Sequence, residues 1–159
     1  MRAVLSRLSY LDAYCDAHPT DGMSCNDAPG GGGRRTSAPP AGVQIPLPPA
    51  LPLRAIVLLD PYGALFSRDH LTAVTMPVLQ FRPDHSQLGE ENCAGLAASL
   101  PIPPQFRTIP GSHFIFFDIC PPSLQAAAPE VCTNPPGVDR AAVHAAVEAQ
   151  VVRFLKDNL

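Results

Sequence analysis

The stretch "LRAIVLLD", from Leu53 to Asp60, is a mostly apolar run that ends at an Asp-Pro step. A continuous apolar run, rather than an alternating one, is typical of a strand that is buried on both faces of a parallel sheet. A second such run, "MPVLQFRPD", extends from Met76 to Asp84. A third strand is expected over residues 105–109, followed by a turn that carries His113. These three segments predict the fold.

Two other segments have apolar residues at helical spacing, residues 89–101 and residues 139–159. Asp139 is a good N-cap for the second helix. The faces expected to be buried consist of Cys93, Leu96, Ala97 and Leu100 in the first helix, and of Val143, Val147, Val151, Phe154 and Leu155 in the second. Strands that alternate with helices predict an α/β fold with a parallel sheet of about three strands, which looks like the end of a larger sheet.

The chain divides into three parts by composition. Residues 1–28 carry apolar positions at helical spacing up to about residue 16, followed by a loop between two cysteines. Residues 29–52, "PGGGGRRTSAPPAGVQIPLPPALP", have the composition of a flexible and then extended linker. Residues 53–159 contain the predicted α/β portion.

Composition narrows the classes of function. The 159 residues are enough for one ordinary domain, and with 46% apolar and 16% charged residues the chain can form a core. A net charge of −3 argues against nucleic acid as a partner. The longest apolar runs fall short of the roughly 18 residues that a membrane span needs, so no span is expected.

Four of the five cysteines form two pairs that flank short loops, Cys15 with Cys25 and Cys120 with Cys132. Two local disulfides are one interpretation and buried free thiols are the other. The spacings do not fit a metal site, so neither a metal nor a cofactor is predicted. Disulfides would indicate a periplasmic or secreted protein, but the N-terminal residues lack a signal peptide. That conflict suggests that the true N-terminus of the protein is not in this chain.

Three polar residues follow the three predicted strands: Asp60, Asp84 and His113. The carboxyl ends of parallel strands meet at one edge of a sheet, where functional groups collect. A carboxylate there can hold the imidazole of His113 in one tautomer and stabilise its charged form. Asp60 precedes a proline, and we interpret it first as a turn residue and second as a catalytic acid. Asp84 is the acid that we expect beside His113.

The ordered set of segments "RAIVLLDPYGALF", "MPVLQFRPDHSQLGEEN", "FRTIPGSHFIFF" and "VCTNPPGVDRAAVHAAVEAQVVRFLKDNL" resembles the C-terminal portion of an α/β-hydrolase. More narrowly, it is similar to the predicted dienelactone hydrolases and their relatives that resemble platelet-activating-factor acetylhydrolase. The segment "LDAYCDAHPTDGMSC" is similar to the part that follows the nucleophile helix in those proteins.

The resemblance implies a Ser–acid–His triad that hydrolyses a small-molecule ester. His113 matches the histidine of the family, and Asp84 lies in the loop that bears the acid. The nucleophile elbow G-x-S-x-G is absent from the sequence. Because the elbow supplies both the serine and part of the oxyanion hole, we expect the isolated chain to be nearly inactive. It would then be a truncated product or a half that lost its N-terminal strands.

Two other functions are considered. A non-catalytic α/β module could bind a partner or a second copy through an exposed sheet edge. A thiol enzyme that uses Cys93 is disfavoured, because this residue lies on the buried face of its predicted helix and has no basic neighbour in the sequence.

Overall fold

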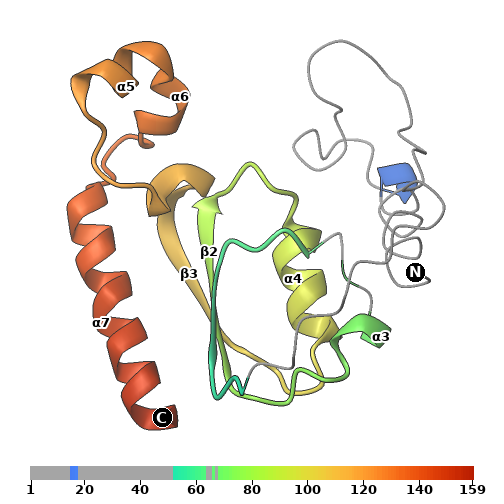
Figure 1. Ribbon diagram of the computed structural model, residues 1–159. Helices are drawn as coiled ribbons and strands as arrows, with labels where there is room; N and C mark the ends of the chain where they lie inside the picture. The colour runs from blue at the N-terminus through green and yellow to red at the C-terminus, as the bar shows by residue number, and fades with distance from the viewer. Residues whose placement is uncertain (1–14, 18–51, 64–65, 67) are drawn as a thin grey trace, which may run out of the picture.

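A computed structural model describes residues 15–17, 52–63, 66 and 68–159. Its elements are β1 (Ile56–Leu59), α3 (Arg68–Leu71), β2 (Val78–His85), α4 (Glu90–Ser99), β3 (Gln105–Ser112), the 3-10 helix η2 (His113–Phe116), α5 (Pro122–Ala127), α6 (Pro129–Cys132) and α7 (Arg140–Asn158). The sheet lies between α7 on one face and α3 and α4 on the other (Figure 1). This arrangement confirms the α/β character expected from the sequence.

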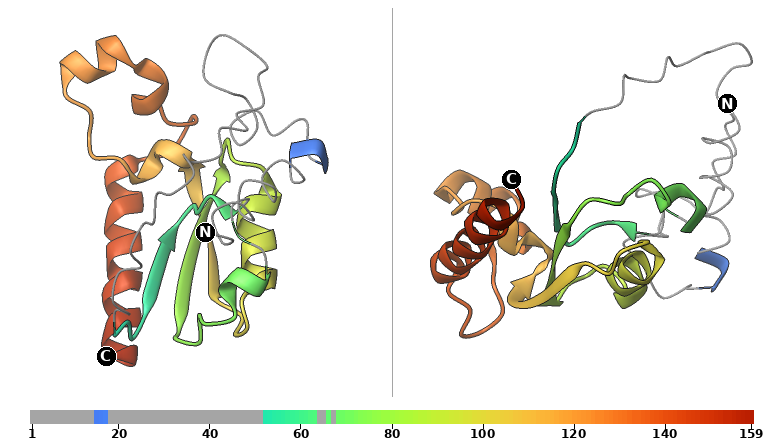
Figure 2. Two further views of the ribbon diagram at one scale, coloured as in Figure 1. Left: turned by 45° about the vertical axis from the view of Figure 1, so that its right-hand side comes forward. Right: turned by 90° about the horizontal axis from the view of Figure 1, so that it is seen from below.

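The sheet has the order β1-β2-β3, and both strand pairs are parallel. Ile56 is opposite Val78, and Leu79 is opposite Gln105. Each parallel connection returns the chain to the same end of the sheet, so the carboxyl ends of all three strands meet at one edge. The views in Figure 2 show the same layers from two further directions.

Two hydrophobic clusters explain why β1 and the first half of β2 are mostly apolar. On the α7 face the cluster consists of Leu79, Phe81, Ile109, Ile115, Val143, Val147 and Phe154, with Val57 packed against it. On the α4 face it consists of Leu71, Val78, Leu96 and Leu100, with Ile56 and Leu58 packed against it. Successive residues of a strand point to opposite faces, so both sets must be apolar when helices cover both faces.

The two long helices agree with the prediction. Asp139 caps α7, and its side chain accepts hydrogen bonds from the backbone N–H groups of Ala141 and Ala142. His144, which lies on the flank of this helix, is 2.6 Å through Nε2 from the carbonyl oxygen of Ile115. That contact ties α7 to η2.

Two strands differ from the prediction. β1 is only partly buried, and Leu59 at its end is 45% exposed, because β1 lies at the edge of the described sheet. β3 extends through Pro110 and Gly111 to Ser112, so His113 begins η2 rather than following a turn. Gly111 has φ +128°, and a Cβ there would lie 2.8 Å from Ile115. The Pro-Gly step is thus part of the strand, where only glycine fits.

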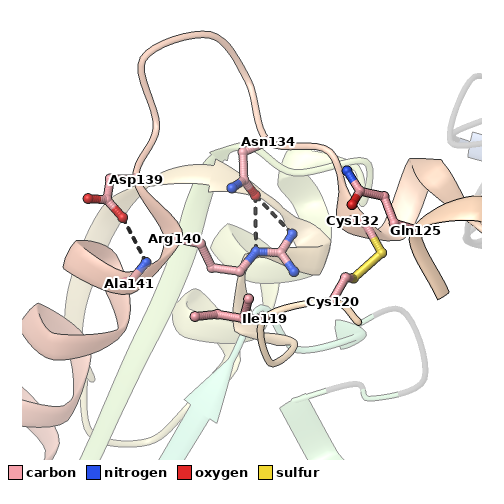
Figure 3. A pocket seen from close by; sticks show the side chains of 8 residues that line it. All are labelled: Ile119, Cys120, Gln125, Cys132, Asn134, Asp139, Arg140 and Ala141. Atoms are coloured by element: carbon pink, nitrogen blue, oxygen red, sulfur yellow. Dashed lines mark hydrogen bonds between the residues drawn. A yellow bond between two sulfur atoms is a disulfide. The ribbon is translucent and has the colours of Figure 1, made fainter. Parts of the chain in front are cut away.

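The helices α5 and α6 form a lobe, residues 121–132, that has no buried residue in either helix. The disulfide between Cys120 and Cys132 closes it, which agrees with the first of the two interpretations of this cysteine pair. The guanidinium of the buried residue Arg140 donates to the carbonyl oxygens of Asp118 and Val131 and to Oδ1 of Asn134. Figure 3 shows the contact between Arg140 and Asn134. Burial lowers the pKa of Arg140. The lobe is therefore held by a covalent bond and polar contacts rather than by a core.

The N-terminal predictions fall largely outside the described residues. Residues 15–17 are helical and Cys15 is disulfide-bonded. Cys25, the predicted partner of Cys15, lies outside the described part, and so do the rest of the predicted helix and residues 29–51 of the linker. Within the described residues, none of the helices combines the length and the apolar character needed to cross a membrane.

We expect the double substitution Cys120→Ala and Cys132→Ala to loosen the lobe and leave the sheet intact. Closing a loop of this size contributes roughly 3 kcal/mol, and α5 and α6 have no buried side chains to replace it. Hydrogen exchange should therefore accelerate by about tenfold or more in α5 and α6. Amides of β2 in the same variant are the internal reference, and unchanged exchange in the lobe would contradict this account.

Candidate active site

The carboxyl edge of the sheet brings together one polar residue from each strand end. Asp60 follows β1, Ser86 follows β2, and His113 follows β3. Nδ1 of His113 lies 2.7 Å from Oδ2 of Asp60. The Asp60 side chain is fully buried, whereas the His113 side chain is 28% exposed. A buried carboxylate thus holds a histidine whose ring reaches the surface.

Asp60 is fixed by its backbone as well as by its side chain. Its N–H donates to the carbonyl oxygen of Phe81 at 2.9 Å, which continues the pairing of β1 with β2. Its φ is +44°, in the left-handed region that aspartate tolerates better than most residues. Such a conformation persists where the surroundings determine it, and it occurs often at functional sites.

The carboxylate of Asp60 accepts hydrogen bonds from three side chains. Besides His113, the hydroxyl of Ser86 donates to Oδ2 at 2.5 Å and the thiol of Cys93 donates to Oδ1 at 3.1 Å. Burial by itself would raise the pKa of Asp60, but these hydrogen bonds outweigh burial and lower it. Asp60 is therefore ionised at neutral pH.

The charge on Asp60 decides which nitrogen of His113 carries the proton. An ionised carboxylate only accepts hydrogen bonds, so Nδ1 must donate, and the neutral ring then has its lone pair on Nε2. Within the part of the chain that the structure describes, Nε2 has no hydrogen-bond partner. The backbone N–H of His113 donates to Oε1 of Gln87 at 2.9 Å, which anchors the start of η2. The result is an oriented imidazole with a free basic nitrogen.

The expected pair of Asp84 and His113 is wrong, because Asp60 takes the place beside the histidine. Asp84 accepts instead from the backbone N–H of Gly111 at 2.9 Å and from Nδ1 of His85 at 2.8 Å. Its side chain is 44% exposed. The hydrogen bond from His85 lowers its pKa. Asp84 still lies inside β2, which extends to His85, and its carboxylate is bonded to the backbone of β3.

Cys93 lies on the buried face of α4, as the sequence predicted. Burial, together with the neighbouring charge of Asp60, raises the pKa of its thiol to about 12. The thiol stays protonated at neutral pH, so Cys93 is a hydrogen-bond donor and not a thiolate nucleophile.

Ser86 and Cys93 were not predicted from the sequence as partners of Asp60. Both are 26 or more positions away from Asp60 along the chain. The only feature of the sequence that pointed to this site was the position of Asp60 at the end of an apolar strand. Comparisons with family models, with curated proteins and with solved structures found no match for this chain.

Replacing Asp60 tests its charge. All three side-chain partners of Asp60 are hydrogen-bond donors. In Asp60→Asn the NH2 group of asparagine is itself a donor, so it would face one of these donors without forming a hydrogen bond. We expect this variant to lose about 2 kcal/mol of unfolding free energy at neutral pH. Because the pKa of Asp60 is lowered on folding, its contribution is complete above the ordinary value of 3.8 and is lost as pH falls through the lower folded value.

The measurement is urea unfolding of the wild type and the variant over a series of pH values. The difference between them should shrink in the acid range, below pH 3.8. Asp84→Asn is the matched control, and its effect should be smaller because the solvent screens its exposed pair. A difference for Asp60→Asn that stays constant from neutral to acid pH would contradict the assignment.

Proposed function

We propose that this chain carries the acid and the histidine of an α/β-hydrolase that acts on carboxylic esters or dienelactones. Asp60 is the acid of that triad and His113 is its base. The observation that supports this proposal is the 2.7 Å bond between Asp60 and Nδ1 of His113 at the carboxyl edge of a parallel sheet. Such edges are where α/β enzymes place their reacting groups.

The reaction follows from the free nitrogen of His113. Nε2 takes the proton of a serine hydroxyl while the serine oxygen bonds to the ester carbonyl carbon. The imidazolium that forms is stabilised by the charge of Asp60. It then returns the proton to the leaving alkoxide as the carbon–oxygen bond of the ester breaks. A water molecule then attacks the acyl-enzyme with the same help from His113, which releases the carboxylic acid product and restores the serine.

The serine itself has to come from outside the described residues. Within these, no hydroxyl or thiol is bonded to Nε2 of His113, and Ser86 and Cys93 both donate to Asp60 instead. The motif G-x-S-x-G is also absent from the sequence. We therefore expect this chain by itself to have low activity.

A second candidate is an interaction module that associates through β1. The observation that favours it is the position of β1 at the edge of the described sheet, with Leu59 exposed. Size-exclusion chromatography separates the two functions, because association through this edge requires a dimer or a larger complex.

Hydrolysis of a p-nitrophenyl ester tests the first function. We expect slow turnover by this chain. Turnover should increase by up to about 10⁶-fold when the chain is extended at its N-terminus by a segment that contains a strand followed by G-x-S-x-G. In the extended chain, His113→Ala and Asp60→Asn should remove most of the gain, and Asp84→Asn should retain it. Fast turnover that survives the substitutions at His113 and Asp60 would overturn the proposal.

A further inference from the structure

The orientation of Asp60 depends on more than its bond to His113. Oδ2 accepts from both His113 and Ser86, and Oδ1 accepts from Cys93. A carboxylate that bonded only to His113 could rotate about its Cβ–Cγ bond. With donors on both oxygens, any such rotation breaks at least one hydrogen bond in a buried site, which is costly.

Ser86 is held so that its hydroxyl proton points to Asp60. Its Oγ accepts the backbone N–H of Leu88 at 3.1 Å, and its own N–H donates to the carbonyl oxygen of Pro83 at 3.2 Å. The first bond occupies a lone pair of Oγ and leaves the O–H free to donate. Ser86 is therefore a donor whose direction is set by the turn after β2.

Cys93, which donates to the other carboxylate oxygen of Asp60, is held in place by the packing of α4 against β2. The buried amide of Gln80 on β2 donates to the backbone carbonyl oxygen of Cys93 at 2.8 Å. Cys93 is 1% exposed, and its thiol also lies 3.8 Å from the carbonyl oxygen of Pro61. Because the thiol stays protonated at neutral pH, it can donate to Asp60.

We propose that Ser86 and Cys93 are positioning residues that hold the carboxylate of Asp60 toward His113, so that Nδ1 keeps the proton and Nε2 remains the base. They touch neither the substrate nor the reacting atoms. The inference rests on the proposed function for its catalytic meaning, but the tautomer of His113 can be measured whether or not the chain hydrolyses an ester.

The test is long-range ¹H–¹⁵N correlation spectroscopy of the imidazole groups in the full ¹⁵N-labelled chain, with His113→Gln to assign His113. In the wild type we expect the neutral ring of His113 to carry its proton on Nδ1, with a downfield resonance for that proton. In Ser86→Ala combined with Cys93→Ala, the carboxylate of Asp60 is no longer held toward Nδ1 and can turn away from it, so we expect that resonance to weaken and part of the neutral ring to shift to the Nε2–H tautomer. Each single alanine variant should shift the population in the same direction.

Conservative variants separate positioning from packing. Cys93→Ser and Cys93→Ala both remove the sulfur atom, but only serine can donate to Asp60, so Cys93→Ser should retain the Nδ1–H tautomer. Ser86→Thr keeps the hydroxyl and should do the same. If the double alanine variant does not fold, the single variants and their conservative counterparts decide the question.

A wild-type tautomer in folded Ser86→Ala and Cys93→Ala would overturn the positioning role and leave the triad proposal standing. Conversely, a tautomer that depends on both donors, in an extended chain that does not hydrolyse esters, would overturn the hydrolase function alone. The two failures are therefore distinguishable.

Discussion

The rest of the structure depends on one buried negative charge, the carboxylate of Asp60. An isolated carboxylate in such a place would cost several kcal/mol, so the fold must bring donors to it. They come from three separate parts of the chain: the turn after β2, the inner face of α4, and the start of η2. Because these segments meet only when the sheet and α4 are assembled, the site and the core form together.

The same chain buries a positive charge by a different route. Arg140 is satisfied by two backbone carbonyl oxygens and an amide oxygen, and none of these carries a charge. Asp60 is instead bonded to a histidine that can take up a proton. The environment of Arg140 suits a fixed support, whereas the environment of Asp60 suits a group whose partner can change its charge.

Much of the fold could be predicted from the sequence because it depends on local patterns. The apolar runs before Asp60 and Asp84 predicted β1 and β2, and apolar residues at helical spacing after the N-cap Asp139 predicted α7. The choice of acid could not be made in this way, because Asp60 and Asp84 have the same local signal, an aspartate at the end of an apolar run. Only the register of β2 against β3, which bonds Asp84 to the backbone of Gly111, separates them. The end of β3 was misplaced for a related reason, since Pro110-Gly111 has the sequence of a turn but stays in the strand where Ile115 leaves room only for glycine.

The lobe of α5 and α6 has a consequence for how this chain can change over evolution. Since neither helix buries a residue, substitutions between Cys120 and Cys132 do not need compensating changes in the core. The two cysteines and Arg140 fix where the segment leaves and rejoins the body, whatever lies between them. This segment can therefore vary in length and sequence, or be exchanged for a longer one, at little cost to the domain that carries it.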